Sequence, residues 1–316
     1  MSSRQEIFRP LDSHHRAIAM QTIADIEHRL DELPLLPTVV TRLLSLDADG
    51  EDYFDQVLGL SEEDPTFALR IIKLSNSAYS SPESDISNLR EAFMRLGVKA
   101  VAGVITSMAA VRTFIPTTKA QKNLWVHSIQ VAVAARSIAR IVTSHEIDPE
   151  QAYLCGLLHD IGRFVLFDAA ADEMNLVEEG GWESPLQLIA VEQEIYGFDH
   201  SELGHSVCRK WGVAPVITKV VAKHHEYGSP KNALNDSKLF ELIRVVQIAD
   251  CFSAFMLVNS DAMSWEPGVL EKELVEKCID PIGSVPPVSA RQLSSIAPKI
   301  VEDSSQMASR LGVGIR

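Results

Sequence analysis

The segment Leu157–Arg163, which reads Leu-Leu-His-Asp-Ile-Gly-Arg, constrains the fold more than any other part of the chain. It places His159 and Asp160 directly between apolar residues. Burying an ionised carboxylate is costly unless the group is paired or bound to a metal ion. The pair is therefore either solvated at a helix end or required by the fold. The other histidines of the chain decide between these two possibilities.

Apolar residues recur at helical spacing through most of the 316 residues, and alternating two-residue patterns are scarce. This periodicity predicts an all-α protein. Hydrophobic residues make up 46% of the chain and charged residues 23%, which is typical of a globular protein with a sizeable core. We predict a compact, two-lobed helical bundle.

The turn at Pro116–Thr118 is the predicted boundary between the lobes, and no Gly/Ser-rich linker separates them. Among the longer predicted helices are residues 13–30, 86–96, 98–114, 119–142, 185–196, 260–282 and 288–312, whereas residues 172–184 show no clear pattern. The predicted units are an N-terminal helical extension (1–28), an N-terminal helical lobe (29–116), a second lobe (117–255) and C-terminal closing helices (256–316).

The net charge of -14 argues against non-specific binding to nucleic acid or to an anionic membrane, because both need a cationic surface. No apolar run approaches 18 residues. The four cysteines, Cys155, Cys208, Cys251 and Cys278, are far apart in apolar helical contexts, without a CxxC pair. They are expected to be buried free thiols in a reducing compartment. We therefore expect a cytoplasmic protein without membrane or nucleic-acid partners.

Histidines and acidic residues recur on the predicted inward faces of the second half of the chain. Taken alone, each of these histidines is compatible with a buried residue that is satisfied by hydrogen bonds. Taken together, they place His or Asp on the inward side of several separate helices, twice as adjacent pairs. The candidate metal ligands are His127, His159, Asp160, His200, His224, His225 and Asp250.

Imidazole and carboxylate ligands without thiolates suit Fe, Mn, Zn, Ni or Co. Seven such ligands suffice for a two-metal site, and an Asp can bridge the two ions. Sites of this kind favour phosphoester hydrolysis. Arg163 lies one turn after His159, where its guanidinium either contacts a phosphate oxygen or is a solvated cation at a helix end.

The segment Leu157–Arg163 resembles the signature of the HD phosphohydrolase superfamily, and the HDOD family is the closer match, over residues 29–255. The matching motifs are Leu33–Pro37, Asp64–Pro65, Leu74–Tyr79, residues 86–97, residues 192–204, Trp211 and the pair His224–His225. The resemblance implies an all-α fold with an HD-type helical core in the second lobe. It also implies a role in bacterial signal transduction through protein partners.

The seven candidate ligands also resemble the ligand set of the HD-GYP phosphodiesterases, which hydrolyse cyclic di-GMP. The chain departs from that pattern in three places. Tyr227-Gly228-Ser229-Pro230 replaces the longer GYP segment, Arg163 replaces a lysine, and Asn123 replaces a glutamate that some trinuclear relatives use. These departures argue against cyclic di-GMP hydrolysis more than against metal binding.

The sequence thus predicts a bacterial HDOD signalling protein that acts mainly through protein partners and keeps an HD-type metal site. The alternative is an active metal-dependent phosphodiesterase or phosphohydrolase that acts on a nucleotide, including a cyclic dinucleotide. A third hypothesis is a metal-free scaffold in which the buried polar residues only bond to one another.

Overall fold

A computed structural model of the chain describes residues 38–62, 88–142, 147–180, 182, 184–228, 236–283 and 287–313, together with residues 26, 67, 71, 72, 74 and 75. Every regular element among these residues is helical, which confirms the predicted all-α fold. The predicted helix over 13–30 lies almost entirely outside the described residues.

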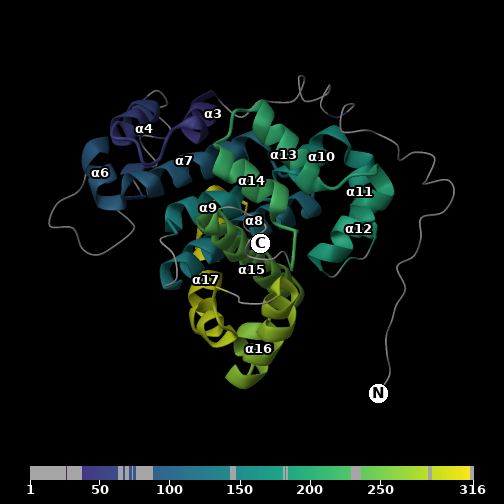
Figure 1. The fold of residues 1–316 in the computed structure, drawn as a ribbon. Coiled ribbons are helices and arrows are strands. Elements are labelled where there is room, and N and C mark those ends of the chain that lie inside the picture. The colour runs from purple at the N-terminus through teal and green to yellow at the C-terminus, as the bar shows by residue number, and fades with distance from the viewer. Residues whose placement is uncertain are drawn as a thin grey trace, which may run out of the picture.

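In the described N-terminal part of the chain, four helices lie at one end of the molecule (Figure 1). They are α3 (Thr38–Ser45), α4 (Tyr53–Glu62), α6 (Leu89–Leu96) and α7 (Val98–Thr113). Gly97, at φ 84°, ends α6 and begins α7, a backbone conformation that glycine adopts without strain. The two helices predicted over 86–96 and 98–114 therefore form where the sequence places them, divided at this glycine.

Eight helices of the second half carry the candidate site. They are α8 (Lys119–Ile141), α9 (Pro149–Leu158), α10 (Ile161–Ala169), α11 (Ala171–Glu179), α12 (Pro185–Tyr196), α13 (His200–Lys210), α14 (Pro215–Lys223) and α15 (Ser237–Val258). Local start signals explain their N-termini: Thr118 and Gln121 form a capping box before α8, and Asp148 caps α9 ahead of Pro149. The helix α11 lies where the sequence shows no clear pattern.

The long helices α8 and α15 form the centre of the molecule (Figure 1). Both are buried over most of their length, as expected of helices that are apolar on several sides. Helix α8 packs against α9, α15 and the C-terminal helix α17 (Ala290–Leu311), while α10 packs against α13 and α13 against α14. All four cysteines are buried and free, which confirms the prediction for their side chains.

The C-terminal part differs from its prediction. Residues 260–282 do not form one helix but the sequence η2 (Ala262–Ser264), α16 (Pro267–Leu274), η3 (Val275–Ile279) and η4 (Asp280–Ile282). Pro267 explains the break before α16 and Pro281 the change to η4, because proline lacks the N–H that a continuing helix needs. The second closing helix is confirmed as α17 (Ala290–Leu311). The division into units at residues 28, 116 and 255 stays a prediction.

Within the described part of the chain, no single helix is both long and apolar enough to cross a membrane.

Asp148 joins the N-terminal helices to the second half and is expected to matter for stability. Its carboxylate caps α9 and lies 2.5 Å from Lys99 Nζ on α7. Burial would raise the pKa of Asp148, but the bonds from Lys99 and the α9 backbone outweigh it and lower the pKa below 3.8. Asp148→Ala should cost about 1–2 kcal/mol at neutral pH, mainly from the lost cap.

The pKa of Asp148 is lower in the folded state than in the unfolded state. Its contribution to stability is therefore fully present above the unfolded-state pKa and is lost as the pH falls through the folded-state pKa. Urea unfolding of wild type and Asp148→Ala should therefore show a stability difference that shrinks below about pH 3.8. A difference that stays constant down to lower pH would contradict the assignment to the charged carboxylate.

Candidate metal centre

Five places in the fold bring the seven predicted ligands together. His127 comes from the middle of α8 and Asp250 from the middle of α15. The remaining five sit at helix ends: His159 and Asp160 between α9 and α10, His200 at the first position of α13, and His224 and His225 directly after α14. Helix ends leave backbone and side chains free to turn inward, so short helices can aim adjacent residues at one point.

The junction between α9 and α10 explains why Asp160 is available. Asp160 is the N-cap residue of α10, a position where Asp usually accepts a hydrogen bond from the helix backbone. Here its side chain makes no such bond, and its backbone oxygen instead accepts from Arg163 N at 2.9 Å. The carboxylate is therefore free to face the histidines.

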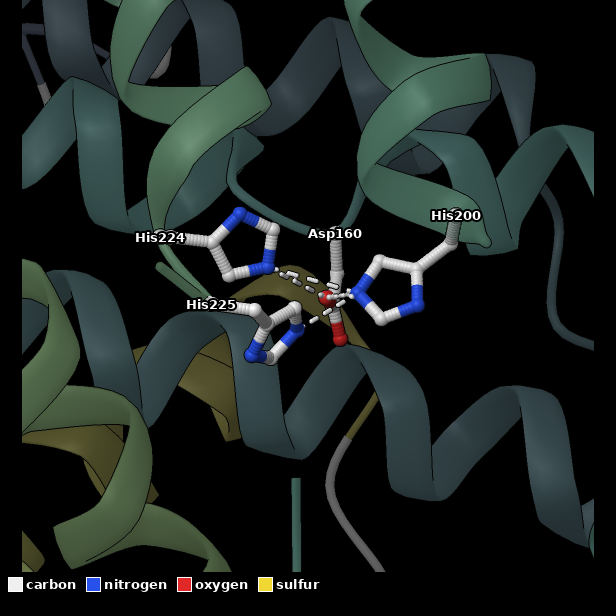
Figure 2. A group of neighbouring side chains, drawn as sticks. All are labelled: Asp160, His200, His224 and His225. Carbon is white, nitrogen blue, oxygen red and sulfur yellow. Dashed lines mark hydrogen bonds and ion pairs between the residues drawn. The ribbon is translucent and has the colours of Figure 1, made fainter. Parts of the chain in front are cut away.

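The seven side chains form two groups. The first group consists of His127, His159 and Asp250, and the second of Asp160, His200, His224 and His225. Within each group the candidate ligand atoms all lie within 4.8 Å of one another. Figure 2 shows the second group, with the three imidazole rings converging on the Asp160 carboxylate.

Nitrogens and carboxylate oxygens face each other closely in both groups. In the first, His127 Nε2 lies 3.3 Å from His159 Nε2 and 3.3 Å from Asp250 Oδ1. In the second, His200 Nε2 lies 2.9 Å from His225 Nε2, 3.3 Å from His224 Nε2 and 2.9 Å from Asp160 Oδ1. These separations match atoms that share one small cation.

Asp160 connects the two groups. Its Oδ1 faces the second group, at 2.9 Å from His200 Nε2 and 3.6 Å from His224 Nε2. The same oxygen lies 3.4 Å from His159 Nε2, and Oδ2 lies 3.7 Å from His127 Nε2, both in the first group. One carboxylate thus reaches both groups, as a ligand bridging two metal ions must.

The outer nitrogens of four histidines are already engaged. His159 Nδ1 donates to the Gly156 carbonyl at 2.8 Å, and His224 Nδ1 donates to the Val221 carbonyl at 2.7 Å. His200 Nδ1 donates to Glu192 Oε2 at 2.6 Å. His127 Nδ1 lies 3.0 Å from Ser253 Oγ.

The contact with Ser253 also shows that His127 Nδ1 is a hydrogen-bond donor. Ser253 Oγ donates its proton to Gln130 Oε1 at 2.9 Å, so it must accept from His127 Nδ1–H. All four rings therefore hold a proton on Nδ1 and turn Nε2 toward the centre. An orientation of this kind, set by a bond on the other ring nitrogen, is typical of metal-ligating histidines.

The centre is buried, and burial shifts its pKa values. His159, His200 and His224 are fully buried, and Asp160 and Asp250 are 3% exposed. Burial lowers the pKa of His159 to about 4. Burial would raise the pKa of Asp160, but His159 and His200 outweigh it and hold the pKa well below its usual range. The centre therefore holds a neutral His159 imidazole beside an ionised Asp160 at neutral pH.

His200 differs from its neighbours. Burial would lower its pKa, but the adjacent Glu192 and Asp160 carboxylates outweigh burial and raise the pKa to about 10. In the metal-free protein at neutral pH its Nε2 thus carries a proton. This proton lies among the Nε2 atoms of His224 and His225 and the Asp160 carboxylate. The donor set fits divalent transition metals, whose ligands are neutral imidazole and carboxylate.

Arg163 lies beside the centre and not in solvent. Its side chain is buried, which makes the prediction of a solvated helix-end cation wrong. Its guanidinium lies 2.6 Å from Glu178 Oε1 and 3.7 Å from Asp160 Oδ2. A phosphate contact by Arg163 stays a prediction.

Sequence reasoning missed several residues around the ligands. Glu192 lies eight residues before His200 on a different helix, and no periodicity links the two. Ser253 lies one turn after Asp250 on α15, so helical spacing could have placed it on the inward face. Tyr227 was also missed; its hydroxyl lies 3.4 Å from both Asp250 Oδ2 and His225 Nδ1.

Two curated relatives resemble parts of the chain. An uncharacterised protein of Treponema pallidum is 22% identical over 202 residues, which are 64% of this chain and 39% of that protein. Ribonuclease Y of Mycoplasma mycoides is 29% identical over 133 residues, which are 42% of this chain and 22% of the enzyme. The chain thus matches well under half the length of either relative.

A solved structure resembles nearly the whole chain. A proposed phosphohydrolase of Shewanella amazonensis SB2B superposes with a TM-score of 0.63 at 22% identity, covering 90% of this chain and 97% of that one. At this level of identity the likeness concerns the fold.

The family model of the HDOD domain matches residues 33–227, which are more than half of the chain and include all candidate ligands except Asp250. The chain therefore belongs to the HDOD family.

Proposed function

We propose that this chain is an HDOD signalling protein that holds divalent transition-metal ions at the two groups of ligands and acts on its partners through protein contacts. One observation carries the metal proposal. Four histidines donate a hydrogen bond from Nδ1 to a neighbouring acceptor, and their Nε2 atoms point toward the same small volume, beside two carboxylates. Imidazole nitrogens that approach to 2.9–3.3 Å must share a proton or a metal ion, and one divalent ion would satisfy several of them at once.

Two ions fit the two groups. Asp160 would bridge them, with His127, His159 and Asp250 holding one ion and His200, His224 and His225 the other. Such ions supply Lewis-acid activation of a phosphoryl oxygen and of water. The chain's own residues would hold and orient the ions: the acceptors on Nδ1 fix each ring, and burial excludes bulk water.

Metal analysis of protein purified without chelator tests the proposal. Wild type should carry Fe, Mn, Zn, Ni or Co at up to two ions per chain, whereas His159→Ala should carry less. His205→Ala is a matched control, because this half-buried histidine of α13 belongs to neither group. Equally little metal in wild type and His159→Ala would contradict metal binding and support the metal-free scaffold.

Metal uptake is expected to release a proton. Because the pKa of His200 is raised to about 10, its Nε2 is protonated across the neutral range, and a metal ion must displace that proton. The affinity should therefore rise with pH, by about tenfold per unit for one displaced proton, up to the pKa.

Calorimetric titration in two buffers of different ionisation enthalpy measures this release. About one proton per ion at the second group is expected at pH 7. An affinity that does not change between pH 6 and 8 would contradict displacement at His200.

A second candidate function is a metal-dependent phosphodiesterase that acts on a nucleotide. It is supported by the two-group arrangement around Asp160 and by the similarity to a ribonuclease over part of the chain. The burial of the ligands favours the signalling role, since six of the seven are less than 9% exposed and a nucleotide phosphate must reach the ions. Turnover of cyclic dinucleotides or RNA with added Mn or Fe, absent in Asp160→Ala, would establish the enzyme.

A further inference from the structure

Carboxylates flank both ring nitrogens of His200. Glu192 Oε2 lies 2.6 Å from Nδ1, and Asp160 Oδ1 lies 2.9 Å from Nε2. The same Glu192 oxygen also accepts the backbone N–H of His200 at 2.9 Å. Glu192 is fully buried. One carboxylate from α12 therefore fixes both the start of α13 and the ring that starts it.

Arg163 reaches the other oxygen of each carboxylate. Its guanidinium lies 3.7 Å from Asp160 Oδ2 through Nη1 and 3.7 Å from Glu192 Oε1 through Nε. Its outer nitrogen binds Glu178, and the group lies over the Trp182 ring at 5.2 Å. His200, Asp160, Arg163 and Glu192 thus form a closed ring of alternating ion partners, which we call the His200 ring.

We infer that Glu192 and Arg163 are positioning residues that set the metal affinity of the second ligand group through the His200 ring. This inference rests on the proposed metal binding. A planar guanidinium can face two carboxylates at once, whereas a lysine ammonium is a single point charge. Arg163 is therefore assigned to the support of Asp160 and Glu192, in place of the phosphate contact predicted from the sequence.

The two ligand groups differ in this support. His200, in the second group, has a buried carboxylate on Nδ1, which raises the basicity of a metal-ligating imidazole. His127, in the first group, has the neutral hydroxyl of Ser253 instead. Removing Glu192 should therefore weaken the second group, and removing Ser253 the first.

Glu192→Gln keeps the shape of the side chain and removes its charge. The amide cannot serve both neighbours, because His200 Nδ1–H and Arg163 Nε are both donors and the amide NH2 must face one of them. We expect Co2+ titration of metal-free protein, followed by visible absorption, to show two ions in wild type. In Glu192→Gln the second ion should bind 10–100-fold more weakly, the usual effect of losing an outer partner of a metal-ligating histidine.

Three further variants sharpen the test. Arg163→Lys should weaken the same ion, because lysine cannot span both carboxylates. Ser253→Ala should weaken the binding of the ion in the first group. Glu202→Gln removes an exposed carboxylate two residues after His200 and should leave both ions unchanged. Circular dichroism and thermal unfolding of each metal-free variant verify that it is folded.

Imidazole NMR of metal-free, histidine-labelled protein gives a reading that does not depend on metal. The Nδ1–H of His200 should resonate strongly downfield in wild type and lose that position in Glu192→Gln, with Glu202→Gln unchanged. Loss of this signal would support positioning even if wild type bound no metal, a result that contradicts the proposed function alone. An unchanged signal, or a second ion bound as tightly in Glu192→Gln as in wild type, would overturn the inference.

Discussion

Asp160→Ala is expected to weaken the binding of both metal ions, whereas loss of any other candidate ligand should weaken the binding of mainly one ion. Asp160 places carboxylate oxygens within 3.7 Å of Nε2 atoms in both groups, with Oδ1 2.9 Å from His200 Nε2 and Oδ2 3.7 Å from His127 Nε2. Removal of a direct ligand should lower the metal affinity by more than the roughly 10–100-fold that follows removal of an outer partner. We expect this variant to bind neither ion at micromolar metal.

The measurement is equilibrium dialysis against Mn2+ or Co2+, followed by elemental analysis. Asp250→Ala and His225→Ala are the matched controls, because each removes one ligand from one group. Each should retain an ion in the other group. Retention of two ions by Asp160→Ala, or the same loss in Asp160→Ala and Asp250→Ala, would show that Asp160 does not bridge the groups.

Loss of metal should also be visible as a loss of stability. A ligand that binds only the folded state stabilises it by an amount that grows with the ratio of free ligand to Kd. Added metal should therefore raise the Tm of wild type and leave that of Asp160→Ala almost unchanged. Equal shifts in both would point to binding elsewhere on this acidic chain.

The seven candidate ligands could be named from the sequence because several of their positions break a local rule. A carboxylate on the apolar face of a predicted helix, as at Asp250, is costly without a partner. Adjacent polar pairs after apolar runs, such as His224–His225, break helical amphipathicity in the same way. The helices α8 and α12 were also predictable, since each has both a cap and a long apolar stripe.

The support of these ligands could not be predicted, because it depends on how separate helices meet. Glu192 contacts His200 only because α12 and α13 turn at Gly197, whose φ is 79°. The burial of Arg163 similarly depends on Glu178 in α11, a helix whose pattern is too weak to recognise from the sequence. Periodicity identifies faces of single helices, whereas these contacts are set by tertiary packing.

The close approach of α10 to α13 depends on Gly162. A Cβ atom at this position would overlap the carbonyl oxygen of His200 and lie 2.9 Å from Gly204 N. Both atoms belong to the backbone, so no side-chain rotation can make room. Gly162→Ala must therefore push the two helices apart, and with them Asp160 and His200, which stand at their N-termini.

We expect Gly162→Ala to destabilise the protein by about 1–3 kcal/mol, the usual range for overpacking. It should also weaken the metal ion of the second group, since the 2.9 Å contact between His200 Nε2 and Asp160 Oδ1 spans the displaced helices. Urea unfolding and Co2+ titration measure the two effects. Both should appear together, because one displacement causes them.

Gly59→Ala is the matched control. Gly59 lies in α4, and among the described residues no atom other than the local backbone and chain neighbours lies within 4 Å of an added Cβ. Alanine is favoured over glycine inside a helix, so this variant should be more stable than wild type by about 0.5–1 kcal/mol, with metal binding unchanged. If Gly162→Ala were as stable as Gly59→Ala, α10 and α13 would not be in the close contact that holds Asp160 beside His200.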